Sequence, residues 1–335
     1  MRREEKVTIR LTELLRSVDP KTEERVEAAR RRANNAVRTT LRDRTRLSLT
    51  TEGEGQRHAR PVPVKLKPGM PAHVADVEFD DDIHVLLELS RIRRLMEAGV
   101  ADWSSYQEVD ARLETTDSIA LDPLGAQAFE HHKARFEALL EILDARDPVA
   151  KILAVESDVL GVYLYGLRRG APHGEIELYW AIIGLVSDLL GVHVEDLTIV
   201  VLTHELAHAY TQAGFDIDGQ VWDTFNFGDS DLAVKEGLAQ YFTHVCLQAK
   251  ADAFPSAFGV FETLRKRQPV AYSAHVDWVD RSTPEAVRRA MLEARRRRAP
   301  VTRQAFDDLV RSATAALPPR GVGGPRGSVS REVRS

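Results

Sequence analysis

The chain has 335 residues, of which 43% are hydrophobic and 29% are charged. This composition is ordinary for a globular protein and excludes collagen-like, disulfide-scaffold and wholly disordered classes. The 46 basic and 51 acidic residues nearly balance, with a net charge of −5. This balance excludes a protein that binds nucleic acid over its whole surface.

The cysteine count and the apolar stretches indicate in which cellular compartment the protein is expected. Cys246 is the only cysteine, which excludes an intrachain disulfide and thiolate metal clusters. The first residues, MRREEKVTIR, carry charges where a secretory signal needs an unbroken apolar run. The longest apolar region, residues 178–194, is interrupted by Asp188 and is shorter than the about 20 residues of a membrane span. We therefore expect a cytoplasmic protein without a membrane partner.

The N-terminal part of the chain predicts helices on both sides of a proline-rich segment. Residues 1–60 are rich in Arg, Glu and Thr and predict a charged helical arm or partner surface. Residues 61–73 carry four prolines in their first eleven positions, which indicates a linker or an extended edge segment. Over residues 74–155, apolar residues recur at three- and four-residue steps, notably at 82–98 and 124–145. This spacing predicts helices that pack on the next domain.

The pattern then changes to that of a sheet. Residues 159–166 are β-branched and aromatic, and residues 175–179 alternate like a strand, so we predict a hairpin. An apolar helix follows over residues 181–190. A long helix then runs from residue 194 or 196 to 213, closed by Gly214 as a C-terminal cap.

The rest of the chain is predicted to be helical up to a tail. The expected helices span residues 231–251, 257–267, 283–298 and 302–316. Residues 317–335 are rich in Pro and Gly and predict a disordered tail. Residues 156–316 are therefore expected to form an α+β domain.

The sequence HELAH inside the long predicted helix contains the residues that we expect to bind a metal ion and to act in catalysis. His204 and His208 are four residues apart, which places both imidazoles on one helix face about one turn apart. Two imidazoles leave room on zinc for a third protein ligand and a water, as in catalytic sites. Glu205 can reach that water and act as general base. Two exposed histidines are the alternative, but the uncharged residues 199–203 indicate a buried helix.

Glu236, in the sequence KEGLAQYF, is the best candidate for the third ligand. Its apolar neighbours predict a buried helix, where a carboxylate needs a cation or a partner to offset desolvation. A surface Glu on an amphipathic helix is the alternative. Gln240, one turn later, could orient a ligating histidine or could be a plain polar position.

HELAH followed by a helix with EGLAQYF resembles the gluzincin group of zincin-like zinc metallopeptidases, over about residues 155–250. The resemblance implies His204, His208 and Glu236 as zinc ligands and Glu205 as general base. It also implies a zincin-like fold, in which a small antiparallel or mixed sheet accompanies the HExxH helix. Gln240 departs from the acidic residue that many relatives carry at its position.

The resemblance implies two further parts of an active site. An edge strand aligns the extended peptide by main-chain pairing in this group, and residues 159–165 or 175–179 could be that strand. As core strands they need no such role. The developing oxyanion needs a donor, commonly Tyr or His. Tyr272 and His275, in a turn-like stretch after the Glu236 helix, are the candidates.

We therefore expect a zinc-dependent metallopeptidase that hydrolyses peptide bonds in a peptide or protein substrate, with one zinc ion as cofactor. The alternative is a catalytically silent zincin-like binding or regulatory protein, associated with nucleic acid through its basic ends. Residues 281–335 contain 13 Arg and 5 acidic residues. However, the run at 295–298 is explained more simply as a solvated helix face, because no DNA-binding pattern accompanies it. Nucleic acid is therefore not the expected partner.

Overall fold

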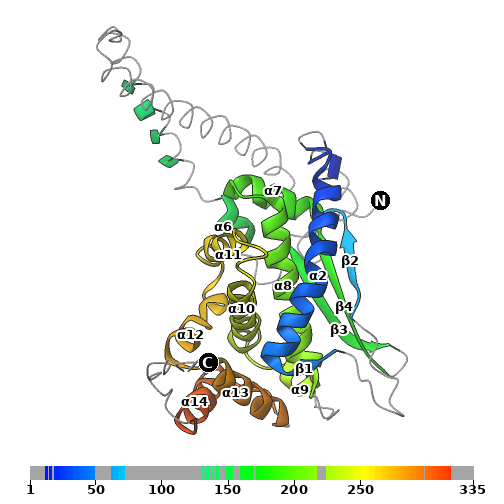
Figure 1. Cartoon of the computed structure of the whole chain (residues 1–335), viewed down its shortest axis with the longest axis vertical. Coiled ribbons are helices and arrows are strands. Elements are labelled where there is room, and N and C mark those ends of the chain that lie inside the picture. The colour runs from blue at the N-terminus through cyan, green and yellow to red at the C-terminus, as the bar shows by residue number, and fades with distance from the viewer. Residues whose placement is uncertain are drawn as a thin grey trace, which may run out of the picture.

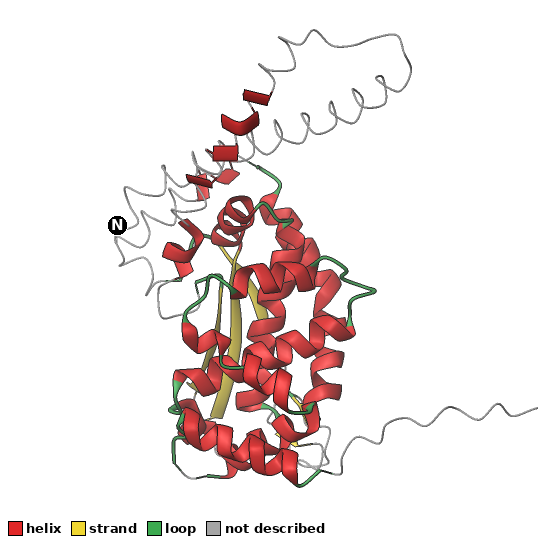
Figure 2. Cartoon of the chain, turned by 90° about the vertical axis from the view of Figure 1, so that its left-hand side faces the viewer, coloured by secondary structure: helices red, strands yellow, loops and turns green. Residues whose placement is uncertain are grey.

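The computed structural model describes residues 19–49, 62–71, 148–153, 159–168, 171–216, 224–297 and 299–317, with scattered positions at 12–16 and 130–142. In this part of the chain the fold is mixed α and β, with many helices and a small three-stranded sheet along one side (Figures 1 and 2). The predicted α+β class is confirmed at this level. The helix predicted over residues 82–98, most of that over 124–145, and nearly all of the predicted tail lie outside the described residues.

The predicted helices from residue 181 onward are present, with ends that differ by a few residues. The helices are α2 (Thr22–Thr45), α6 (Pro148–Leu153), α7 (Trp180–Leu190), α8 (Val194–Ala213), α9 (Thr224–Gly228), α10 (Leu232–Ala249), α11 (Ala257–Arg265), α12 (Val276–Arg281), α13 (Pro284–Arg296) and α14 (Arg303–Ala315). A 3-10 helix, η1 (Val270–Ser273), and α12 occupy the stretch that the sequence predicted to be turn-like.

The sheet has the strand order β2-β4-β3. Its strands are β2 (Val64–Lys67), β3 (Gly161–Arg168) and β4 (Ala171–Tyr179). β4 pairs antiparallel with β3 and parallel with β2, so the proline-rich segment contributes an extended edge strand. Because β4 is paired on both sides, the prediction that residues 175–179 could align a peptide is wrong. β3 is the other edge strand within the described residues. A short antiparallel pair, β1 (Leu47–Ser48) with β5 (Phe215–Asp216), lies apart from this sheet.

The helix α2 departs most from what the sequence predicted, because it packs in the core instead of forming an arm. It lies along α8 and also contacts α10 and α7 (Figure 1). Its buried positions recur at three- and four-residue steps and are mostly small: Val26, Ala29, Ala33, Val37 and Leu41. Small side chains give a weak hydrophobic signal among many arginines, yet they allow helices to approach closely. A two-point ion pair of Arg25 with Glu195, at 2.8 Å, ties α2 to the start of α8.

The helix α8 is covered on all sides, which is why its sequence lacks a polar face. Residues 197–211 are all buried, beneath α2, α7, α10, α11 and the strands β3 and β4. The HELAH sequence therefore lies in the core of the fold. Among the described residues, no helix is long and apolar enough to cross a membrane.

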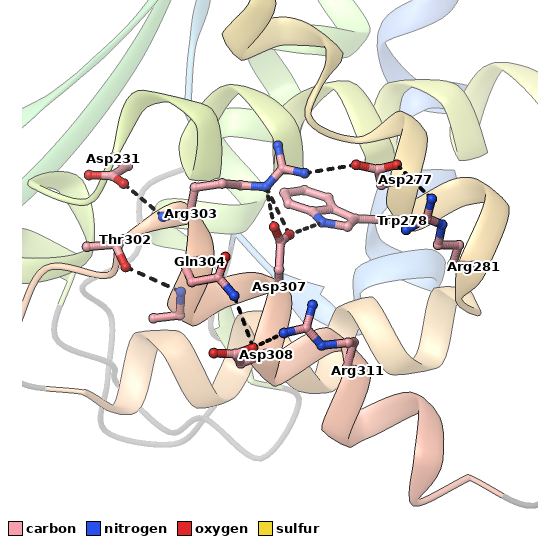
Figure 3. Close-up of polar contacts among 11 residues, drawn as sticks. Asp231, Asp277, Trp278, Arg281, Thr302, Arg303, Gln304, Asp307, Asp308 and Arg311 are labelled. Carbon is pink, nitrogen blue, oxygen red and sulfur yellow. Dashed lines mark hydrogen bonds and ion pairs between the residues drawn. The ribbon is translucent and has the colours of Figure 1, made fainter.

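The C-terminal helices are joined to α10 by a cluster of polar contacts around Trp278 (Figure 3). The Trp278 indole Nε1 donates to Asp307 Oδ1 at 2.7 Å. The Arg303 guanidinium lies over the Trp278 ring, 5.2 Å from its centroid, and pairs with Asp307 at 2.8 Å. The Arg303 backbone N–H donates to Asp231, just before α10, at 2.8 Å. These contacts hold the Trp278 ring in place.

The run of arginines at 295–298 is not a uniform solvated face, and the prediction is wrong at Arg295. This side chain is 1% exposed, and its Nη2 donates to the Gly214 carbonyl at the end of α8 at 2.6 Å. Arg296 is about half exposed and lies 3.6 Å from Glu293. Arg295 therefore helps to hold α13 against α8 and offers no charge to an external partner.

Candidate metal centre

Three side chains from α8 and α10 converge in the core. The Nε2 atoms of His204 and His208 are 3.1 Å apart, and each lies 3.3 Å from Glu236 Oε2. All three residues are buried, which rules out the surface alternatives for the histidines and for Glu236. Within the described residues, these three form a group that could hold a metal ion.

The spacing and chemistry of these atoms fit a metal ion. Ligands about 2.1 Å from a tetrahedral zinc ion lie about 3.4 Å from one another, close to the observed 3.1–3.3 Å. Two imidazole nitrogens and one carboxylate oxygen suit zinc, and also other divalent transition metals. Three protein ligands leave a tetrahedral ion one further position, as in catalytic sites.

Glu236 is held as an anion between the imidazoles. Burial raises the pKa of its carboxyl group, but the charge of His208 and hydrogen bonds to both histidines lower it by more. The net result is a pKa below the ordinary range for Glu. A buried carboxylate of this kind needs a cation to offset its desolvation. A metal ion bound to the two Nε2 atoms would displace their protons and take over that role.

Glu205 lies beside the triad and against the first residue of β3. It is 1% exposed. A Cβ atom placed on Gly161 would lie 2.9 Å from Glu205 Cγ, 3.0 Å from Glu205 Oε1 and 2.9 Å from Val201 Cγ1. Only glycine leaves room for this carboxylate. Gly161 was not among the predicted site residues, although a glycine at the start of a β-rich run is itself a signal of close approach.

A pocket opens next to His204 and Glu205, with about 480 Å³ of empty space when its solvent-open mouth is included. Its described lining is mainly apolar: Leu153, Val159, Leu160, Val200, Val201, Phe261, Leu264 and Pro269. Tyr272 also lines it, and its ring is stacked near that of His204, with centroids 6.0 Å apart. The structure therefore brings one of the two predicted oxyanion donors to the site.

His275 lies elsewhere and has a different task. Its Nδ1 is 2.9 Å from the Tyr272 carbonyl, and since a carbonyl only accepts, Nδ1 carries the proton. Burial lowers the pKa of His275 to about 4, so the ring is neutral and its Nε2 has no proton to donate. Its ring neighbours are His244 and Phe261, and it is not among the described residues that line the pocket. His275 therefore holds the turn that carries Tyr272 in place through this hydrogen bond. Its position does not support the predicted role as a donor to the oxyanion.

Gln240 and Gly237 complete the surroundings of Glu236. Gln240 Nε2 donates to Gln268 Oε1 at 2.9 Å, so its amide is engaged by another glutamine and the predicted orientation of a ligating histidine by Gln240 is not seen. Gly237 packs against the Trp278 ring: a Cβ there would lie 2.7 Å from Trp278 Cη2. Gly237 could not be recognised from the sequence, because its partner Trp278 is far away along the chain.

Comparison of the chain with protein-family models, with curated proteins and with solved structures gave no match. The likeness to gluzincins therefore rests on the two motifs and on the buried triad. At the level that the structure supports, the chain is a mixed α and β protein with a candidate metal centre.

Proposed function

We propose that the chain is a zinc-dependent metallopeptidase of the gluzincin type. The observation that carries the proposal is the buried triad of His204, His208 and Glu236, with Glu205 lining the same pocket as His204. The pocket next to His204 and Glu205 supports it, because it offers space for a substrate side chain.

In this proposal His204, His208 and Glu236 hold the zinc ion. When bound, zinc would supply a Lewis acid that polarises a carbonyl group and lowers the pKa of a water molecule. Glu205 takes a proton from the attacking water, holds it on its carboxylate and delivers it to the nitrogen of the leaving amine. Gly161 keeps space for this carboxylate, as the close approach of its backbone to Glu205 indicates.

Two neighbouring elements are assigned to the substrate. β3 aligns an extended peptide along its free edge, because it has no second partner strand among the described residues and main-chain pairing is a general mode of peptide recognition. Tyr272 donates a hydrogen bond to the oxyanion that develops on the scissile carbonyl. Its ring lies next to that of His204.

A Glu205→Gln variant tests the proposal. The parent chain, loaded with zinc, is incubated with a complex peptide mixture, and new termini are detected by mass spectrometry. We expect cleavage by the parent, none by the variant, and equal zinc content in both. Glu293→Gln, at a half-exposed surface position, is the matched control and should cleave like the parent. Zinc binding without cleavage by the parent would refute the peptidase and favour the silent binding protein.

A further inference from the structure

Two glutamine side chains stand out in the mainly apolar pocket. Gln240 comes from α10, and Gln268 from the turn between α11 and η1. Their amides are joined by the bond from Gln240 Nε2 to Gln268 Oε1 at 2.9 Å. Gln240 is 3% exposed, and its Oε1 accepts no hydrogen bond from any described residue.

A buried amide oxygen without a donor is costly. Leaving such a group unsatisfied costs about 1–3 kcal/mol, and buried polar groups in folded proteins are normally bonded. Ligand pockets are the common exception, because they combine apolar walls with a few polar groups that fix the ligand. The free capacity of Gln240 therefore indicates a ligand group that hydrogen-bonds at this point.

The rest of the pocket limits the chemistry of that ligand group. Apart from Glu205, and His204 of the metal triad, the described lining carries no ionisable side chain other than Tyr272. Because Glu205 is assigned to the attacking water and His204 to the metal, a charged ligand side chain would lose its hydration without gaining a counter-ion of its own there. Val270, between the lining residues Pro269 and Tyr272, is 87% exposed. An apolar residue this exposed in the turn that lines the pocket is suited to contact a bound ligand.

We propose that this pocket binds a glutamine side chain of the substrate, whose primary amide completes the hydrogen bonds of the Gln240–Gln268 pair. A primary amide both donates and accepts, so it matches the pair whichever way the Gln240 amide is turned. The two methylene groups of a glutamine suit the apolar walls, and the group is uncharged. This inference names the substrate class for the proposed peptidase and rests on that function for the position of the scissile bond.

Binding calorimetry on the zinc-loaded full chain tests the inference without requiring turnover. The probes are two peptide hydroxamates that differ in one side chain, glutamine or norleucine. The hydroxamate group engages the metal equally in both, so the ratio of their Kd values reports on the pocket. We expect the glutamine probe to bind about tenfold more tightly, since one hydrogen bond to a buried group is worth about that factor.

Variants show whether the amide pair produces this ratio. Gln240→Met keeps the length and removes the amide, and we expect the preference to vanish or to reverse toward norleucine. Gln248→Met, at an exposed position of the same helix, should keep the tenfold ratio. If Gln240→Met unfolds, Gln268→Met at the less buried partner replaces it, with the same expectation.

Several results would overturn the inference: equal or tighter binding of norleucine by the parent, a ratio unchanged by loss of the amide, or no binding of either probe by a sample whose zinc content has been verified by elemental analysis. These results are distinguishable from failure of the proposed function. A chain that prefers the glutamine probe but cleaves nothing would refute the peptidase and keep the pocket assignment. A chain that cleaves peptides but shows no preference in the calorimetry would keep the proposed peptidase and refute the pocket assignment.

Discussion

Replacing Gly237 by alanine should disturb the metal centre through Trp278. The added Cβ would lie 2.7 Å and 2.9 Å from two ring carbons of Trp278 and 3.0 Å from Ala274 Cβ. Carbon atoms pack at about 3.5–4.0 Å, so ring and helix must separate by close to 1 Å. The ring cannot move freely, because Asp307 and Arg303 hold it (Figure 3).

The strain should therefore appear in α10, where the proposed metal ligand Glu236 directly precedes Gly237. Overpacking of this kind costs about 1–3 kcal/mol of unfolding free energy. We also expect the zinc affinity to fall by about 10- to 100-fold, as it does when groups that position metal ligands are altered. Urea unfolding measures the first effect, and competition with a chromophoric chelator measures the second.

Two further variants make the test sharp. Gly259→Ala on α11 meets no atom within 4 Å and should gain about 0.5–1 kcal/mol, the ordinary benefit of alanine over glycine in a helix. In a Trp278→Leu background the collision is removed, so adding Gly237→Ala should cost little. An unfolding free energy for Gly237→Ala within 0.5 kcal/mol of the parent would refute the reasoning, where about 0.5 kcal/mol is the usual range of surface substitutions.

The remaining predictions concern the general base, the anchor histidine and the first described helix. Gly161→Ala should displace the Glu205 carboxylate and lower the rate of peptide cleavage at least tenfold with zinc retained; parental rates would contradict the assigned role. The folded chain holds His275 neutral with a pKa of about 4, whereas the unfolded chain binds its proton below about pH 6.5. Stability should thus fall as the pH drops from about 6.5 to 4, by up to about 3 kcal/mol from this residue. Urea unfolding of His275→Phe should show a shallower pH dependence, and an unchanged slope would exclude His275 as its source. Leu41→Ala, at a fully buried position of α2, should cost about 2–5 kcal/mol in the same assay, whereas a loss under about 0.5 kcal/mol would fit an arm.

The features predicted correctly are those whose signals are local in the sequence. The spacing of His204 and His208 within HELAH, and the apolar neighbours of Glu236, are readable within one helix each. Helices α7, α8 and α10 follow from the same periodicity. The sequence therefore predicts the candidate metal ligands and the helices that carry them.

The features that were missed depend on contacts between distant parts of the chain. Gly161 matters because of Glu205, and Gly237 because of Trp278. Arg295 is buried because it reaches a carbonyl 81 residues away. α2 lies in the core through small residues that give a weak hydrophobic signal when read alone. No local pattern reports such pairings, so only the folded structure reveals them.

Metal content, measured by elemental mass spectrometry on the purified full chain after zinc reconstitution and dialysis, tests the central claim most directly. We predict about one zinc ion per chain in the parent, since three protein ligands define one site. His204→Ala and Glu236→Ala should each lose most of it, whereas His131→Ala, outside the triad, should keep it. A parent chain without zinc, or a Glu236→Ala variant that retains a full complement, would contradict the three-ligand centre.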